Sequence, residues 1–318
     1  MNKQINKNIK NILFNCGDLK TKQSVFIIYD NSTKKISNLF QNYLKSLQIK
    51  FDISFQKVTK YHGKELSKSC YELAKNHDLI ISLTKYSIAH TSFRLKLSKL
   101  SKNFLSLPFY DLSLLSHKSL DVNFRKLTPL ARKISSLLEK SKFINILSKN
   151  GTCFNFKVNR AKSNCCPGWV YKGNIASPPD AEVNIPILGN HSNGQLVIDG
   201  SVTHELIGKL NSPIVINFCN GKIVSIKGKK SLQLKKILSN RLKQIMPAEF
   251  GIGLNKKCQL SGDMLMDEGI YGSIHIGIGS NSTIGGDKKI KFHLDFVLID
   301  PIVYTDDKIL IKNNKIYV

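Results

Sequence analysis

The chain has 318 residues, of which 42% are hydrophobic, and it carries a formal net charge of +26 at pH 7. This length allows two domains with hydrophobic cores of their own. No apolar run approaches the roughly 18 residues of a membrane span, and segment 1–14 lacks the apolar stretch and cleavage site of a signal peptide. We therefore expect a protein without a membrane partner.

The positive charge comes mainly from lysines spread along the whole chain. The arginines are Arg94, Arg125, Arg132, Arg160 and Arg241. A specific nucleic-acid site normally uses arginine and concentrates its charge. We expect no specific nucleic-acid partner, although such a surface associates loosely with polyanions.

The seven cysteines are odd in number and irregular in spacing, and none form a C-x-x-C pair. This pattern argues against a zinc ribbon and against a disulfide framework. Together with the lack of a signal peptide, it predicts a cytoplasmic protein.

Residues 1–148 alternate between strand and helix patterns. We predict strands at 24–30, 50–58, 78–84 and 103–110, and helices at 34–47, 63–77, 92–100 and 122–142. Strands separated by helices predict an α/β, Rossmann-like domain with a mostly parallel sheet. No glycine-rich phosphate loop follows the first strand, so a dinucleotide site is not expected.

Residues 149–318 contain short apolar runs separated by Gly, Asn, Asp and Pro, with one helix pattern at 231–245. This is typical of a turn-rich, antiparallel β domain. We therefore predict an α/β N-terminal domain, residues 1–148, followed by a β-rich C-terminal domain, residues 149–318.

Histidines and carboxylates lie inside apolar runs of the second half. In a strand, side chains alternate between two faces, so His275 shares its face with Ser273, Gly277 and Gly279 while isoleucines take the other. Small neighbours of this kind leave open space beside the imidazole, which suits a ligand site better than a filled core.

The run 293–298 places His293 and Asp295 on one face of a second strand, which would bury both. Buried polar groups need partners, and an ordinary hydrogen-bonded pair would satisfy them. Glu182 and Glu249 lie in similar runs of the same domain, where a turn or surface role is the simpler interpretation of each. Carboxylates and imidazoles together also suit Zn, Mn, Co or Fe(II). Spacing alone leaves both interpretations open.

Several segments resemble the thermophilic metalloaminopeptidase family typified by aminopeptidase T and aminopeptidase S, with its leucyl aminopeptidase-like members. The resemblance covers most of the chain. The matching segments are 89–108, 151–168, 177–186, 248–255, 267–281 and 293–298. The last three of them together make the resemblance specific.

This resemblance implies a hydrolase that removes N-terminal residues from peptides, in a homodimer of chains with an α/β domain and a β-rich domain. It implies a divalent metal site, with Zn, Co or Mn in two positions and Asp295 or a glutamate as the bridge. Glu268 would transfer a proton or support the ligands. The implied ligands are Glu182, Glu249, His275, His293 and Asp295.

The chain departs from the aminopeptidase pattern at several positions. Ser282 stands where the aminopeptidases have a tyrosine, and Cys153 stands where they have an aspartate. Two alternatives therefore stay open. One is a non-haem dioxygenase that opens dihydroxypyridine rings, with one Fe(II) on His275, His293 and Asp295. The other is a non-catalytic relative that binds a peptide.

Overall fold

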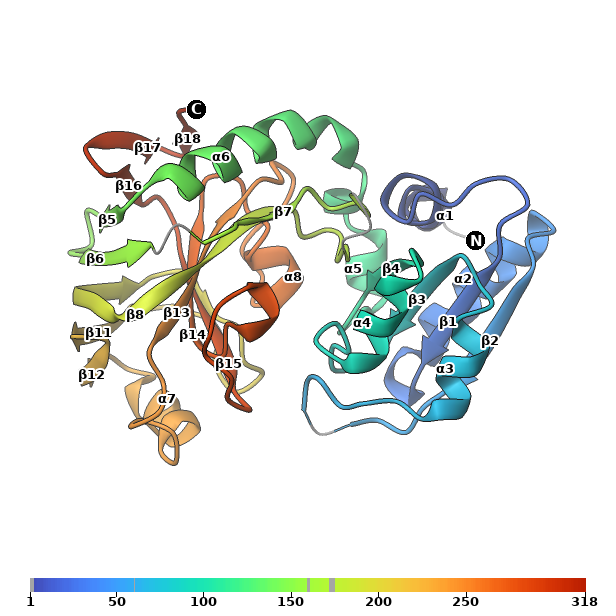
Figure 1. The fold of residues 1–318 in the computed structure, drawn as a ribbon, viewed down its shortest axis with the longest axis horizontal. Helices are drawn as coiled ribbons and strands as arrows, with labels where there is room; N and C mark the ends of the chain where they lie inside the picture. Colours follow the sequence, from blue (N-terminus) through green and yellow to red (C-terminus); the bar gives the residue numbers. More distant parts are fainter. Residues whose placement is uncertain (1–2, 60, 159–160, 172–174) are drawn as a thin grey trace. The chain divides into compact units, whose positions relative to one another are not determined.

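The computed structural model describes residues 3–59, 61–158, 161–171 and 175–318 (Figure 1). The chain divides into two compact units, residues 1–126 with 166–179 and residues 127–165 with 180–318. This division differs from the predicted boundary at 148–149. Strand 143–147 pairs with strands of the second unit, whereas Ala176 forms a parallel bridge with Leu105 of the first.

The first unit contains the predicted parallel sheet, which is confirmed. Its four strands lie in the order β2-β1-β3-β4, and every neighbouring pair is parallel. The strands are β1 (Val25–Tyr29), β2 (Phe51–Phe55), β3 (Leu79–Leu83) and β4 (Asn103–Ser106).

Helices pack against this sheet, and those predicted at 34–47, 63–77 and 92–100 are present with altered bounds. One of them begins later than predicted, at Lys68, because the Ser67 side chain accepts a hydrogen bond from the Cys70 N–H as an N-cap. The α-helices are α1 (Lys3–Lys10), α2 (Lys34–Ser46), α3 (Lys68–Ala74), α4 (Ser92–Lys99) and α5 (Leu112–Ser116), with a π-helix η1 (Asn11–Cys16) and 3₁₀ turns η2 (Asn31–Thr33), η3 (Lys118–Leu120) and η4 (Phe124–Leu127).

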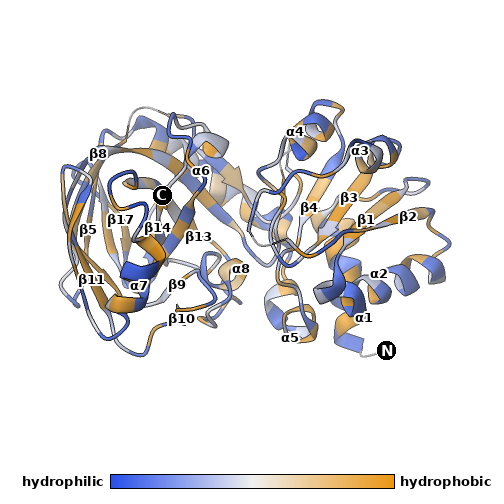
Figure 2. Cartoon of the chain, turned by 90° about the horizontal axis from the view of Figure 1, so that it is seen from below, coloured by the Kyte–Doolittle hydropathy of each residue, from blue (hydrophilic) through white to orange (hydrophobic). Residues whose placement is uncertain are grey.

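One core of this unit lies between the sheet and helices α3 and α4. Phe26 and Ile80 from the strands pack with Ala74 of α3 and with Phe93 and Leu97 of α4. Figure 2 shows β1, β3 and β4 as largely hydrophobic ribbons, which is typical of parallel strands that are covered on both faces.

The second unit is built around a large, mainly antiparallel sheet, as predicted. Strand order is β10-β9-β15-β14-β13-β8-β6-β5-β16-β17-β18, with β11 and β7 also pairing β8 and with β12 pairing β11. The strands are β5 (Phe143–Leu147), β6 (Cys153–Val158), β7 (Asn164–Cys166), β8 (Glu182–Ile198), β9 (Ser201–Val202), β10 (Gly208–Lys209), β11 (Ile214–Cys219), β12 (Lys222–Lys227), β13 (Pro247–Gly253), β14 (Ile274–Gly279), β15 (His293–Leu298), β16 (Ile302–Thr305), β17 (Lys308–Lys312) and β18 (Lys315–Ile316).

Among the described residues of this unit, three α-helices and a 3₁₀ turn accompany the sheet. They are α6 (Thr128–Lys140), α7 (Ser231–Leu238), α8 (Met264–Asp267) and η5 (Ser282–Ile284). The helix predicted at 122–142 is a 3₁₀ turn followed by α6, which begins at Thr128 with Pro129 in its first turn. In the part of the chain that the structure describes, no helix is both long and apolar enough to cross a membrane.

Three neighbouring strands, β13, β14 and β15, have one apolar and one polar face. Phe250, Ile276 and Phe296 lie side by side in the register and are fully buried. Phe250 also packs against the ring of Phe156, with ring centroids 5.4 Å apart. This apolar side anchors the strands in the core and fixes which residues their other side presents.

Candidate metal centre

The polar face of these strands collects the acids and histidines predicted from the sequence. Glu249 on β13 lies opposite Gly277 on β14, and Gly277 lies opposite Asp295 on β15. His275 lies opposite Gly251, one row further along. Because every second residue shares a face, the strand register alone brings these side chains together.

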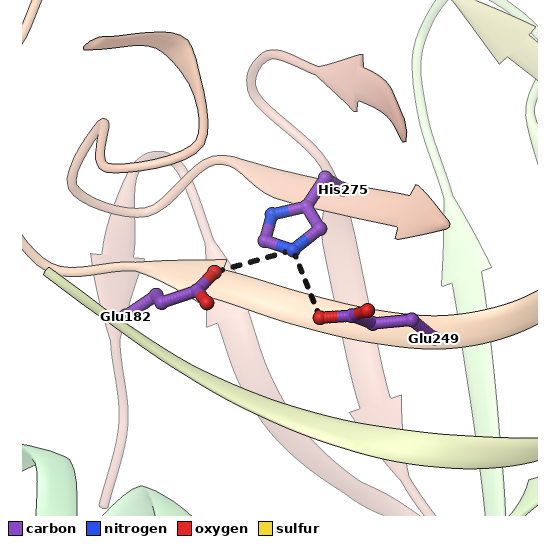
Figure 3. A group of neighbouring side chains, drawn as sticks. All are labelled: Glu182, Glu249 and His275. Carbon is purple, nitrogen blue, oxygen red and sulfur yellow. Dashed lines mark ion pairs between the residues drawn. The ribbon is translucent and has the colours of Figure 1, made fainter. Parts of the chain in front are cut away.

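Glu182, Glu249 and His275 form a first group of ligand atoms, all within 4.8 Å of one another (Figure 3). His275 Nε2 lies 3.2 Å from Glu182 Oε2 and 3.8 Å from Glu249 Oε1. The three residues come from β14, β8 and β13, and all three are buried. One imidazole nitrogen therefore points between two carboxylates.

Glu249, His293 and Asp295 form a second group within the same 4.8 Å limit. His293 Nε2 lies 3.4 Å from Glu249 Oε2 and 2.9 Å from Asp295 Oδ1. Glu249 thus directs one carboxylate oxygen to each imidazole. Asp295 is buried as predicted, whereas the His293 side chain is 35% exposed, so the prediction that both are buried holds for only one of them.

Glycines make room for these side chains. A Cβ on Gly277 would lie 2.8 Å from Asp295 Oδ1, 2.8 Å from His293 Cε1 and 2.9 Å from Glu249 Cβ. A Cβ on Gly251 would lie 2.0 Å from the His275 ring. The space expected beside His275 exists, and the ligand side chains themselves use it.

Two polar contacts that the sequence did not reveal orient the ligands. Asn184 Nδ2 donates to Glu182 Oε1 over 2.6 Å, and Asn164 Nδ2 donates to Asn184 Oδ1 over 2.9 Å. His293 Nδ1 lies 2.8 Å from the Ser280 carbonyl oxygen. Donation to that carbonyl puts a proton on Nδ1. A metal would then bind at Nε2 and replace the contact that this nitrogen makes with Asp295.

The pKa values of this site depend on five neighbouring carboxyl groups and two imidazoles. The carboxyl groups are those of Asp180, Glu182, Glu249, Glu268 and Asp295, and the imidazoles are those of His275 and His293. Burial lowers the pKa of His275, but Glu182, Glu249 and Asp295 together outweigh it and raise this pKa to about 9. Burial raises the pKa of Glu182 to about 7 despite the opposing influence of His275. The raised pKa of His275 shows that the neighbouring carboxylates favour positive charge at this position, which divalent cations could supply in place of protons.

Two further carboxyl groups border the ligands. Glu268, at the C-terminal end of α8, hydrogen bonds with Asp295. Burial and the charge of Asp295 raise the pKa of Glu268 well above its usual value, so Glu268 is the donor in this bond. Asp180 was missed at the sequence level, although it lies two residues before Glu182. Its pKa is also raised well above its usual value, first by burial and then by Glu182.

The residues present fit divalent metal ions. Asp180 Oδ1 and Glu268 Oε1 are buried and have no hydrogen-bond partner, a costly arrangement unless a cation or a proton compensates. Glu182 Oε2 also has no hydrogen bond, and its one close polar neighbour among the ligand groups is His275 Nε2. Imidazole nitrogen and carboxylate oxygen are suitable donors for Zn, Mn, Co and Fe(II).

Two other sequence positions have local roles. Ser282 is exposed, and its hydroxyl lies 3.3 Å from that of Ser280. Asp267, next to Glu268, accepts hydrogen bonds from the Ser261 and Gly262 N–H groups and so closes the loop before α8.

A comparison with protein families matches residues 37–318 to NicX, described as 2,5-dihydroxypyridine 5,6-dioxygenase. The match extends over most of both units and includes every residue of the two ligand groups.

Two solved structures are similar over almost the whole chain. The 2,5-dihydroxypyridine dioxygenase from Pseudomonas putida KT2440 gives a TM-score of 0.82 at 18% identity, covering 100% of this chain and 98% of that one. AmpT from Thermus thermophilus gives 0.73 at 12% identity, covering 99% of each chain. The fold expected from the aminopeptidase resemblance is thus confirmed, and a dioxygenase has it too.

Among curated proteins, guanylate cyclase beta from Plasmodium falciparum (isolate 3D7) is 41% identical over 61 residues, which is 19% of this chain. The chain spans about 2% of the length of that protein. This short match carries no assignment of activity.

Proposed function

The chain belongs to the 2,5-dihydroxypyridine 5,6-dioxygenase (NicX) family, and from this premise we propose that it is a metal-dependent enzyme. From the two ligand groups that share Glu249 we propose that its site holds two divalent ions. We propose further that it hydrolyses an amide bond, as an aminopeptidase that removes N-terminal residues from peptides. The C-terminal unit contains the whole of the proposed ligand set.

The position of Glu249 carries this proposal. Its two carboxylate oxygens face different imidazoles, Oε1 toward His275 and Oε2 toward His293. A carboxylate shared in this way is suited to bridging two ions, and two-ion sites are common in aminopeptidases. A single Fe(II) on two histidines and one carboxylate would instead need His275, His293 and Asp295 in one group. The structure divides them between two groups that share Glu249.

Each ion would have its own ligands besides Glu249. Glu182 and His275 would hold one, and His293 and Asp295 the other. When bound, such ions polarise a carbonyl group and lower the pKa of water toward about 7. The carboxylates offset the charge of the ions, and the Asn184 and Ser280 contacts keep Glu182 and His293 in position.

Glu268 is the proposed proton-transfer residue. It lies beside Asp295, and its pKa is raised well above the usual range by burial and by the charge of Asp295, which favours the protonated carboxyl group. An acid of this kind can donate a proton to the amine that leaves when an amide is cleaved.

The family match favours a second candidate, an Fe(II)-dependent dioxygenase that opens a dihydroxypyridine ring. His275, His293 and Asp295 would be its ligands, with the glutamates outside the metal shell. The exposed Ser282, in place of the tyrosine of aminopeptidases, is compatible with this candidate.

Activity assays on one purified preparation separate the two candidates. The protein is reconstituted with Zn, Mn, Co or anaerobic Fe(II) and given peptides with free or acetylated N-termini, or 2,5-dihydroxypyridine with oxygen. The hydrolase proposal predicts release of N-terminal residues from free peptides only. Oxygen uptake with the pyridine, without peptide cleavage, would establish the dioxygenase instead.

A further inference from the structure

A cationic segment of the second unit lies outside the metal centre. Residues 220–246 contain seven lysines and one arginine and have no aspartate or glutamate. This segment comprises β12, α7 and the turns that follow α7. Its cations are concentrated, unlike those of the chain as a whole, where 22 carboxylates accompany 48 lysines and arginines.

The strand and the helix of this segment lie next to each other, and both carry exposed lysines. β12 pairs only with β11 among the described strands, so it is an edge of the sheet, and α7 contacts it. Lys222 and Lys227 are exposed on the strand, and Lys235 and Lys236 on the helix. We call these four lysines, with Val224 and Leu232, the basic surface.

Large apolar side chains are exposed among these cations. Leu232 is 75% exposed and Val224 is 66% exposed. Leu232, Lys235 and Lys236 have the i, i+3, i+4 spacing of one helix face, while Leu234 and Leu238 are buried on the other side of α7. Figure 2 shows the same mixture of hydrophilic and hydrophobic segments along α7.

We propose that the basic surface binds anionic lipid membranes at their surface. Clustered lysines on an amphipathic helix are attracted to acidic headgroups, and an exposed leucine can enter the boundary between headgroups and acyl chains. A single-stranded nucleic acid would call for aromatic side chains among the cations, and residues 220–246 contain none. Surface binding needs no membrane span, so this proposal revises the expectation that the protein has no membrane partner.

Co-sedimentation of the full chain with vesicles tests the proposal. Vesicles of phosphatidylcholine with about one third phosphatidylglycerol are compared with pure phosphatidylcholine, at low and physiological salt. We expect binding to the anionic vesicles only, with affinity falling as salt rises. The double variant Lys235→Glu/Lys236→Glu should bind at least tenfold more weakly, and Leu232→Ser severalfold more weakly at physiological salt.

The control is Lys34→Glu/Lys35→Glu on α2, where both lysines are exposed and the change in net charge is the same. It should retain binding within about twofold. Equal loss in both double variants would show that only net charge matters and would overturn the proposal. The proposal would also be overturned if the wild-type protein did not bind anionic vesicles at physiological salt. Binding of a 20-nucleotide single strand under the same conditions would then favour a nucleic-acid partner.

Discussion

Strands β3 and β14 are both completely buried, yet they bury different chemistry. β3 has apolar residues at four of its five positions, which suits a strand covered on both faces. In β14 isoleucines alternate with His275, Gly277 and Gly279. A buried face without apolar side chains cannot be explained by packing alone. The difference marks the polar face of β13–β15 as the candidate site, because its buried polar residues are not accounted for by core packing.

Loss of the shared ligand should have the largest effect. Glu249→Gln keeps the size of the side chain but removes its charge from both ligand groups. We expect loss of most bound metal and a decrease in turnover of at least about 10³-fold, roughly 4 kcal/mol of transition-state stabilisation. Elemental analysis and kinetics measure both quantities. If Glu249→Gln retained full metal content and activity, Glu249 would not be a metal ligand.

The next largest effect concerns proton transfer. Glu268→Gln keeps a polar group beside Asp295 but cannot exchange a proton, so turnover should fall about 10²- to 10³-fold while metal content stays near normal. The neighbouring variant Asp267→Asn is the matched control. It should lower stability through the loop bonds to Ser261 and Gly262 without selective loss of turnover. A fully active Glu268→Gln enzyme would contradict the proposed role.

Gly277→Ala tests the polar face with a single methyl group. The new Cβ would crowd Asp295, His293 and Glu249, and we expect metal affinity to fall about tenfold, within the range seen when support of metal ligands is disturbed. Ile276→Val, on the apolar face of the same strand, is the control. It should leave metal affinity unchanged, whereas equal losses in the two variants would show that the faces are not functionally distinct.

The smallest effect is expected in the first unit. Ile80→Val removes one methyl group from the core of β3, and it should lower the free energy of unfolding by about 1 kcal/mol. Bound metal per folded chain should not change, because Ile80 and the ligands lie in different units. Denaturant unfolding and elemental analysis together check this prediction.

Alternation of side chains was enough to predict much of the site. It placed His275 on a face with glycines, and it paired His293 with Asp295. Helix α1 could also have been found, because Ile5 and Ile9 are spaced by four residues and are both buried. The predicted helix at 231–245 ends early, at Leu238, where Ser239 and Asn240 follow. Both residues favour turns over helix interiors.

Other features depend on contacts between distant segments. Asn184 lies two residues after Glu182, so alternation places them on one strand face, but nothing local marks the bond from Asn164, 20 residues away, to Asn184. The sharing of Glu249 between two imidazoles depends on the register of three strands. Spacing along the sequence can propose that ligands exist, but only strand pairing shows how they are divided.

The number of ions bound per chain tests the central claim most directly. Purified protein is stripped of metal, titrated with Zn, Mn, Co or anaerobic Fe(II), and analysed for metal bound to folded chain. Two divalent ions per wild-type chain, both weakened by Glu249→Gln, is the predicted result. A single Fe(II) per chain that persists in Glu249→Gln would contradict the two-ion site and favour the dioxygenase.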